Sequence, residues 1–140
     1  MCLAVKPIEG RYIDNFSKYG TGLMNTSDET KTGYNNIFPS NIITTDNIEE
    51  SIDNIFLVSK PNKKEKKEYN THLSVKPISL ISHLIKLFTK EQAIILDPFI
   101  GSGTTAIACI ESNRNYIGYD INKEYIDITE RRIKDYQTSV

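Results

Sequence analysis

Apolar residues form two short runs in the second half of the chain, and these runs predict strands. Residues 93–96, Ala-Ile-Ile-Leu, are continuously apolar, which is typical of a strand buried on both faces of a parallel sheet. Residues 116–119, Tyr-Ile-Gly-Tyr, predict a second strand that ends at Asp120. Between the two runs, residues 106–110 are small and apolar, as expected for a helix that packs tightly on a sheet. This order of strand, loop, helix and strand predicts an α/β fold.

The spacing of apolar residues predicts two further helices. Pro77 suits the first position of a helix, and the segment after it repeats apolar residues at helical spacing, at Ile81, Leu84, Ile85 and Phe88. This helix is expected to pack beside the strand at residues 93–96 and so to bring residues 71–76 to the ligand-binding end of the sheet. Residues 122–136 predict an amphipathic helix that closes the sheet edge, with Asn122 as its N-cap.

The first half of the chain has a weaker pattern. Residues 1–8 predict a strand that runs into a turn; because no partner precedes it, the chain is expected to begin in the middle of a fold. Residues 9–53 are rich in Asn, Thr, Ser, Gly and Tyr without a long apolar period, which predicts loops and short strands. Residues 54–60 predict the clearest strand of this half, and a lysine-rich loop follows it.

Composition narrows the class of protein. The chain has 140 residues, of which 39% are hydrophobic, enough for one domain with a modest core. Its two cysteines are far apart, and Cys109 falls in an apolar helical segment, which favours a core position over a reactive one. The sequence shows neither an apolar run long enough to span a membrane nor a signal-peptide pattern, so a cytoplasmic protein is expected.

The charges are unevenly placed along the chain. A net charge of -1 argues against indiscriminate binding of nucleic acid. Five lysines nevertheless lie within eight residues, and they follow an acidic segment. Such a cluster either neutralises several phosphates of DNA or is a solvated loop, and the sequence leaves both interpretations open. These lysines are Lys60, Lys63, Lys64, Lys66 and Lys67.

Acidic residues end both predicted strands of the second half, and glycines lie between them. Asp97 lies at the carboxyl end of the first strand, where open α/β sheets bind ligands and where a carboxylate is costly unless it is used. Gly101 and Gly103 lack side chains and let the backbone approach a ligand. Asp120 follows Gly101 by 19 residues, close to the spacing at which an acidic residue binds ribose hydroxyls. The alternative for Asp120 is a cap on the next helix.

Three motifs in this region resemble a known family. They are His72-Leu-Ser-Val-Lys76-Pro77, Asp97-Pro98-Phe99-Ile100-Gly101-Ser102-Gly103-Thr104-Thr105 and Ile117-Gly118-Tyr119-Asp120-Ile-Asn122. Their order and spacing resemble the C-terminal half of DNA amino-methyltransferases of restriction–modification systems, which use S-adenosylmethionine to methylate the exocyclic amine of adenine or cytosine. The resemblance is close over residues 71–134 and looser over residues 1–67.

The resemblance implies a fold and a division of the chain. The fold would be α/β, a partial Rossmann-like methyltransferase fold with an irregular N-terminal region. Residues 1–70 would contain the last strand of a missing half, loops like those of a target-recognition region, and the lysine-rich loop. Those recognition-like loops either read base edges or stay loosely ordered without a partner domain. Residues 71–140 would be the cofactor-binding half.

The resemblance further implies S-adenosylmethionine as cofactor and DNA as partner. Asp97 would face the ammonium or sulfonium group, Phe99 would lie against the cofactor, and Asp120 would hold the ribose. Lys76 would lie either at the cofactor carboxylate or on the surface. Because His72 has no second ligand at metal spacing, no metal site is expected. The full set of cofactor residues comprises Thr71, His72, Lys76, Asp97, Pro98, Phe99, Gly101, Ser102, Gly103, Thr104, Thr105 and Asp120.

The catalytic motif of that family, Asp/Asn/Ser-Pro-Pro-Tyr/Phe/Trp, does not occur in the sequence. The prolines stand at 7, 39, 61, 77 and 98, each isolated, so no catalytic residue is assigned. The resulting hypothesis is a chain that needs a separate N-terminal fragment carrying Asp-Pro-Pro-Tyr in order to transfer methyl groups. The alternative is an inactive remnant or a DNA-binding module without catalysis. A dinucleotide-dependent oxidoreductase is disfavoured: the glycines fit Gly-x-Gly-x-x-Ala, but Asp97-Pro98-Phe99 has no role in binding a pyrophosphate.

Overall fold

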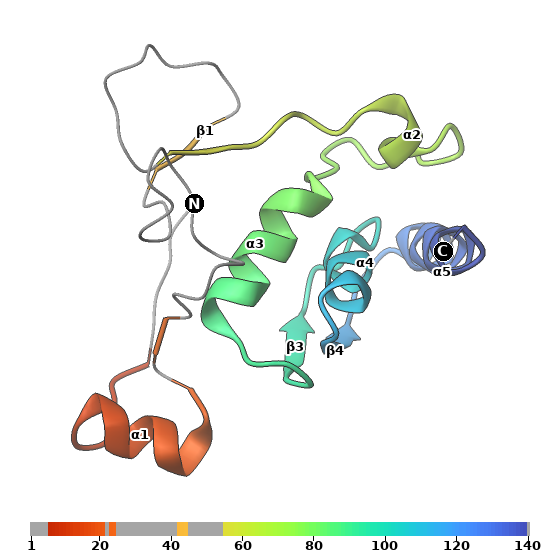
Figure 1. Ribbon diagram of the computed structural model, residues 1–140. Coiled ribbons are helices and arrows are strands. Elements are labelled where there is room, and N and C mark those ends of the chain that lie inside the picture. The colour runs from red at the N-terminus through yellow and green to blue at the C-terminus, as the bar shows by residue number, and fades with distance from the viewer. Residues whose placement is uncertain (1–5, 22, 25–41, 45–54, 140) are drawn as a thin grey trace.

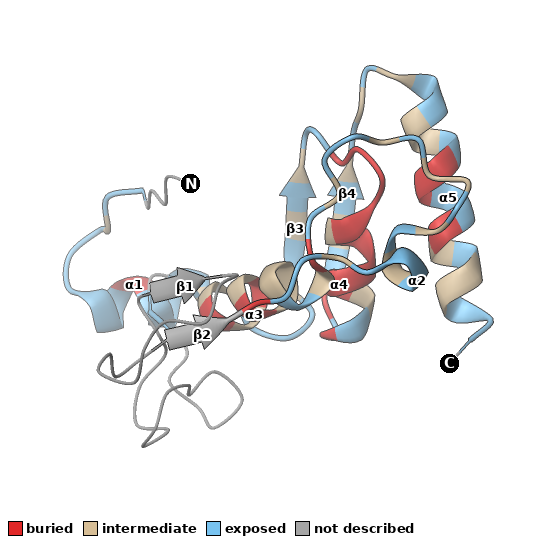
Figure 2. Ribbon diagram, turned by 90° about the horizontal axis from the view of Figure 1, so that it is seen from above, coloured by how far each residue is buried: buried red, intermediate tan, exposed pale blue. Residues whose placement is uncertain are grey.

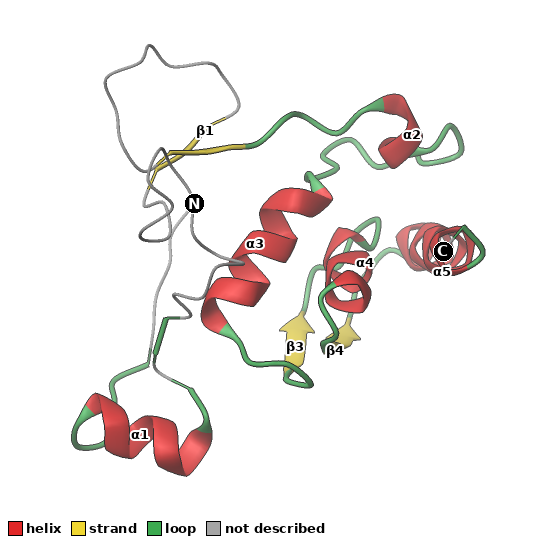
Figure 3. Cartoon of the chain, viewed as in Figure 1, coloured by secondary structure: helices red, strands yellow, loops and turns green. Residues whose placement is uncertain are grey.

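The computed structural model describes residues 6–21, 23–24, 42–44 and 55–139 of the chain. The strand predicted for residues 1–8 and most of the loops predicted for residues 9–53 therefore lie outside the described residues. In chain order the elements are α1 (Tyr12–Tyr19), β1 (Ile42–Thr44), β2 (Ile55–Leu57), α2 (Lys63–Lys66), α3 (Ile78–Phe88), β3 (Ile94–Asp97), α4 (Thr104–Glu111), β4 (Asn115–Gly118) and α5 (Lys123–Gln137) (Figures 1 and 3).

A parallel βαβ unit forms the centre of the second half. β3 and β4 pair in parallel, with Ile94 opposite Asn115 and Asp97 opposite Gly118, and α4 connects them. α4 also packs against α3 on one side and α5 on the other. The strands and helices predicted for this half are present, with bounds that differ by a few residues at most.

The described helices cover only one face of the β3–β4 sheet. Ile95 and Tyr116 pack against a core formed by Ile85, Ala108 and Cys109. The other face is open, and its residues are Ile94 (66% exposed), Leu96 (63%), Ile117 (45%) and Tyr119 (62%). The prediction of a strand buried on both faces is wrong for the described chain, because α3 and α4 lie on the same side of the strands (Figure 2). Cys109 is a core residue as predicted, and burial raises the pKa of its thiol to about 11.

Polar side chains cap the first turns of α3 and α5. α3 begins at Ile78, and Pro77 occupies the N-cap with φ -62° and ψ 133°, so the predicted start was early by one residue. The Ile78 N–H donates to Glu65 Oε1 at 2.6 Å, so a side chain from α2 caps α3. At the start of α5 the Asn122 side chain accepts the Glu124 N–H at 2.9 Å, which confirms the predicted N-cap.

The N-terminal region contains a helix where loops and short strands were predicted. α1 starts after Arg11, which pairs with Asp14 through both backbone and side chain, and it ends at Gly20 with φ 68°. The helix has only eight residues, so the spacing of its four hydrophobic residues covers too short a stretch to be recognised in a polar sequence.

The lysine-rich loop contains a short helix. α2 is capped by Asn62, whose side chain accepts the Glu65 N–H at 2.9 Å. The strand predicted for residues 54–60 is present as β2, which pairs in parallel with β1. The lysine-rich segment, residues 60–67, thus links β2 to the second half of the chain.

Candidate functional site

A cavity of about 240 Å³ opens at the carboxyl end of β3, where α/β sheets bind ligands. Its lining comes from the loop before α3, from α3 itself, from the end of β3, from the β3–α4 loop and from the start of α4. The lining residues are His72, Ser74, Lys76, Ile81, Asp97, Phe99, Ile100, Gly101, Ser102, Thr104 and Thr105. The structure therefore brings most of the predicted cofactor residues to one cavity. Those that do not line it are Thr71, Pro98, Gly103 and Asp120.

Asp97 ends β3 and is fixed by two hydrogen bonds. Its Oδ1 accepts the Phe99 N–H at 3.0 Å, and its Oδ2 accepts the Thr105 hydroxyl at 2.6 Å. These bonds tie the end of the strand to the first turn of α4. An ionised carboxylate has about four lone-pair sites, so Asp97 retains the capacity to bind a cationic group in the cavity.

The glycine loop, residues 100–103, lies against His72 and α5. Gly101 has φ +53°, and a Cβ there would lie 2.7 Å from His72 Nε2. Gly103 has φ +81°, and a Cβ there would lie 2.7 Å from Thr129 Cγ2. Both positions therefore require glycine, for backbone conformation and for close approach.

His72 is oriented by neighbours on both sides of its ring. Its Nδ1 accepts the Ser74 N–H at 3.1 Å, and its ring centroid lies 4.5 Å from that of Tyr125. Because Nδ1 is an acceptor, the neutral ring carries its hydrogen on Nε2, the atom next to Gly101. Lys76 is exposed, and its ammonium group donates to Ser74 Oγ at 2.6 Å.

Asp120 binds the glycine loop directly. Its Oδ2 accepts the Gly101 N–H at 2.9 Å, and its Oδ1 accepts the Asn122 N–H at 2.9 Å. The carboxylate thereby connects the end of β4 to the loop and to the start of α5. The N-cap of α5 itself is Asn122, so Asp120 is not the capping residue of that helix.

One face of α5 contributes to the site and was not identified from the sequence. Thr129 donates its hydroxyl to Gly101 O at 2.8 Å, and Arg132 Nη1 donates to Ser102 O at 2.6 Å. Arg132 is 1% exposed, and burial lowers the pKa of its guanidinium. Tyr125, Thr129 and Arg132 lie on one face of α5 at helical spacing. In a polar helix, however, this spacing does not indicate which face is buried.

The lysine-rich segment does not line the cavity, and the residues just after it are held against α5. Tyr69 donates its hydroxyl to Asp135 Oδ2 at 2.6 Å, and the Arg131 guanidinium lies 3.7 Å from the Tyr69 ring centroid. Thr71 binds α5 as well, through a 2.7 Å bond from its hydroxyl to Glu124. Of the five predicted DNA-contacting lysines, Lys60, Lys63, Lys64 and Lys66 are exposed, and Lys67 is half-buried.

The Tyr69–Asp135 contact predicts a pH dependence of stability. Burial, together with the Asp135 carboxylate, raises the pKa of Tyr69 from 10.0 to about 12, so the folded state holds the phenol proton more tightly than the unfolded chain. The resulting stability is complete below pH 10 and is lost as the pH rises through about 12. We expect the difference in urea midpoint between the wild type and Tyr69→Phe to be constant up to pH 10 and to shrink above it. A difference that stayed constant to pH 12 would contradict this account of Tyr69.

The part of the chain that the structure describes contains neither a metal-binding cluster nor a membrane-spanning helix. Among those residues, no group of three or more His, Cys, Asp or Glu side chains is arranged to hold a metal ion. None of the helices seen there is long and apolar enough to cross a membrane.

Comparison with known proteins gives consistent matches. A family model described as DNA methylase matches residues 12–131. The type II methyltransferase M.HindIII of Haemophilus influenzae is 48% identical over 62 residues, which are 44% of this chain and 20% of that protein. M.Cfr9I of Citrobacter freundii is 39% identical over 69 residues, which are 49% of this chain and 23% of that protein. The chain thus spans only a fifth to a quarter of the length of these curated relatives.

Solved structures agree with the sequence matches. A crystal structure of an M1.HpyAVI–SAM complex is 32% identical with a TM-score of 0.51, over 66% of this chain and 43% of that one. The cytosine-N4-specific PvuII DNA methyltransferase is 18% identical with a TM-score of 0.50, over 62% of this chain and 36% of that one, and supports the fold alone. The predicted partial Rossmann-like fold is confirmed.

Proposed function

The chain belongs to the N6/N4 DNA methylase family, and on this premise we propose that residues 71–140 form the S-adenosylmethionine-binding part of a DNA methyltransferase. The observation that carries the proposal is the cavity at the end of β3, which is lined by the Asp97 side chain together with Gly101 of the glycine loop. When bound, S-adenosylmethionine supplies an electrophilic methyl group on a sulfonium ion. Since the cofactor carries positive charge and has no phosphate, the Asp97 carboxylate beside the backbone of Gly101 suits it.

Five residues of the cavity, and Asp120 beside it, have binding roles in this proposal. Asp97 attracts the cationic end of the cofactor, and Phe99, which is 84% exposed, covers it at the mouth of the cavity. His72 presents its Nε2 hydrogen to the methionine part, and Ser102 and Thr104 offer hydroxyls from the loop and the start of α4. Asp120 lies next to Gly101 and uses its remaining lone pairs for the ribose hydroxyls.

Methyl transfer would require groups from outside these 140 residues, because the sequence contains no Pro-Pro pair. We propose that a polypeptide carrying Asp-Pro-Pro-Tyr supplies them and covers the open face of the β3–β4 sheet. Parallel sheets are normally covered on both faces, and four apolar side chains, Ile94, Leu96, Ile117 and Tyr119, are uncovered here. The aligned part of the M1.HpyAVI–SAM complex is 43% of that chain, so most of that methyltransferase lies outside the part matched here.

Reconstitution tests the proposal. The chain is mixed with an N-terminal methyltransferase fragment that carries Asp-Pro-Pro-Tyr, and transfer of tritiated methyl groups to DNA is measured. We call this mixture the reconstituted enzyme. We expect transfer by the mixture and none by either part alone. Robust transfer by the 140-residue chain alone, or a mixture that binds no cofactor, would refute the proposal.

A charge on the open sheet face should weaken this association. Leu96→Lys is expected to change the free energy of unfolding of the chain by less than about 0.5 kcal/mol, because Leu96 is 63% exposed. The same substitution should weaken association with the N-terminal fragment at least about tenfold, because the ammonium group would be buried. Ile13→Lys on α1, 55% exposed, is the matched control and should leave association unchanged. Equal effects of the two substitutions in a pull-down titration would show that this face is not the interface.

The exposed lysines of the lysine-rich segment are proposed to contact DNA phosphates. Each phosphate contact contributes roughly one to the slope of log affinity against log salt concentration. Replacing both Lys63 and Lys64 by alanine should therefore reduce the slope by about two, and replacing Lys123 and Lys134 on α5 should serve as a charge-matched control. An unchanged slope in the Lys63/Lys64 variant would identify the cluster as a solvated surface.

A further inference from the structure

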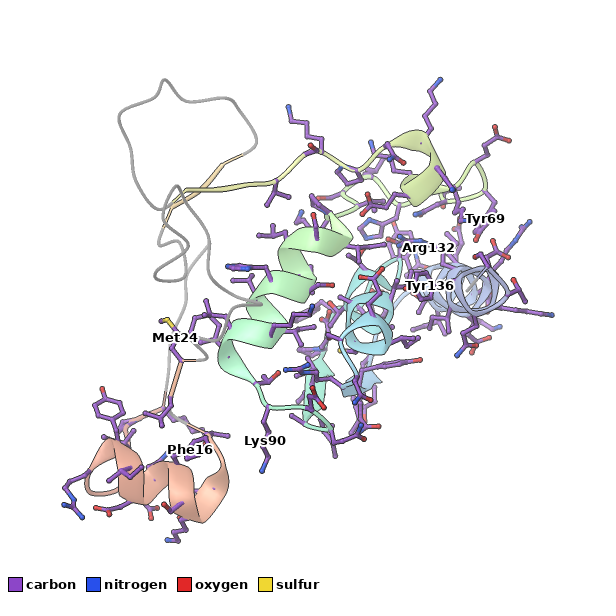
Figure 4. The ribbon with its side chains drawn as sticks, viewed as in Figure 1. Phe16, Met24, Tyr69, Lys90, Arg132 and Tyr136 are labelled. Atoms are coloured by element: carbon purple, nitrogen blue, oxygen red, sulfur yellow. The ribbon has the colours of Figure 1, made fainter. Side chains whose placement is uncertain are left out.

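Arg132 joins two segments that lie far apart in the sequence. Its Nη1 donates to Ser102 O at 2.6 Å in the glycine loop, and its Nη2 donates to Glu65 O at 3.1 Å in the lysine-rich segment. Figure 4 shows Arg132 and Tyr69 near each other, where α5 faces the chain that follows α2. Because a guanidinium is planar and rigid, it fixes the position of the Ser102 carbonyl relative to the Glu65 carbonyl. A displacement of one carbonyl therefore strains the hydrogen bond to the other.

The contacts of Arg132 extend to atoms at the wall of the cavity. The same Nη1 lies 3.1 Å from Ser102 Oγ and 3.4 Å from Thr104 Oγ1, and both of these residues line the cavity. A ligand that engages either hydroxyl therefore changes the hydrogen bonding of Arg132. Residues 60–67 do not line the cavity, so a response there could not come from direct contact with the ligand.

Three other side chains of α5 contact either the glycine loop or the residues just after the lysine-rich segment, but not both. Thr129 binds the glycine loop through Gly101 O. Arg131 and Asp135 bind Tyr69 just after the lysine-rich segment. Arg132 alone among these four residues contacts both sides, with a side chain that is 1% exposed.

We propose that Arg132 is a positioning residue that couples the cofactor cavity to the lysine-rich segment, so that an occupied cavity fixes the lysines for phosphate contact. The coupling rests on the proposed function, in which the cavity binds S-adenosylmethionine and the lysines bind DNA. Thermodynamic linkage makes it reciprocal: DNA on the lysines raises affinity for the cofactor by the same factor.

Hydrogen exchange on the reconstituted enzyme tests the coupling, with S-adenosylhomocysteine as the probe. In the wild type we expect saturating probe to slow exchange at residues 100–105 and also, by about fivefold or more, at residues 63–70. In Arg132→Met the probe should still slow exchange at residues 100–105 but change residues 63–70 less than about twofold. Arg131→Met is the neighbouring control, and it should retain the response at residues 63–70.

A second readout separates coupling from a merely structural role. In the wild type, the probe should raise the affinity for a short DNA duplex by about fivefold. In Arg132→Met, the affinity for DNA with the probe and the affinity without it should be nearly equal. If Arg132 only stabilised the fold, replacing it would weaken binding of DNA both with and without the probe, and the fivefold ratio between these two affinities would remain. Arg132→Lys, which keeps the charge but reaches a single carbonyl, is expected to behave like Arg132→Met and replaces it if that variant does not fold.

Each outcome decides between the two proposals. Protection at residues 100–105 without any change at residues 63–70 in the wild type overturns the coupling and leaves the cofactor site intact. A response at residues 63–70 that persists in the folded Arg132 variants also overturns it. No protection at residues 100–105 in the wild type overturns the cofactor site, and the coupling with it.

Discussion

Replacing Asp97 by alanine is expected to lower the affinity of the reconstituted enzyme for S-adenosylmethionine by about 100-fold, or about 3 kcal/mol. Two contributions add up to this loss. The carboxylate provides charge at the cavity wall for the cationic ligand, and charge-assisted hydrogen bonds contribute about 1.5–3 kcal/mol each. The substitution also leaves the Phe99 N–H and the Thr105 hydroxyl without their acceptor, which loosens the loop that forms the cavity.

Two further variants separate these contributions. Asp97→Asn keeps the shape and removes the charge, so most of the loss should persist. Thr105→Val keeps the charge and removes one hydrogen bond to Asp97, so the affinity should fall less than about tenfold. Isothermal titration gives the affinities, and thermal melting shows whether each variant is folded. If Asp97→Ala is folded and binds as tightly as the wild type, the cofactor is not held at the end of β3.

The features that could be predicted from the sequence are those set by neighbouring residues. The strand before Asp97, the helix after the glycine loop and the Asn122 cap follow from local runs, spacing and capping chemistry. The candidate site was predictable for the same reason, because a carboxylate at a strand end and glycines after it lie within one short stretch. The structure places most of these residues around a single cavity.

The features that could not be predicted depend on contacts between distant segments. The sequence pattern of β3 is that of a strand covered on both faces, and nothing local indicates that Ile94 and Leu96 remain exposed in this chain. In the sequence, Arg132 resembles any exposed arginine of an amphipathic helix. Only the structure shows that it contacts the glycine loop and Glu65. Similarly, α1 depends on a reciprocal pair between Arg11 and Asp14, a weaker signal than the usual N-cap residues.

Gly103→Ala is expected to reduce the free energy of unfolding by about 2–5 kcal/mol, because two costs arise at one position. At φ +81° an alanine is strained by about 1–2 kcal/mol. Its Cβ would also lie 2.7 Å from Thr129 Cγ2 and 2.9 Å from Thr129 Oγ1, the hydroxyl that donates to Gly101 O. Crowding of this kind adds about 1–3 kcal/mol and displaces the glycine loop from the cofactor cavity.

Gly10→Ala and a double variant distinguish the two costs of Gly103→Ala. Gly10 has φ +73°, but a Cβ there would meet its nearest neighbour, Asp14 Oδ2, at an ordinary 3.6 Å, so only the backbone strain applies. Thr129→Ser removes the crowded methyl group and keeps the hydroxyl, so it should restore part of the stability lost in Gly103→Ala. Urea denaturation of the wild type, Gly10→Ala, Gly103→Ala and the double variant Gly103→Ala/Thr129→Ser gives their free energies of unfolding. Equal losses at Gly10 and Gly103, with no recovery in the double variant, would show that backbone strain alone requires glycine at position 103.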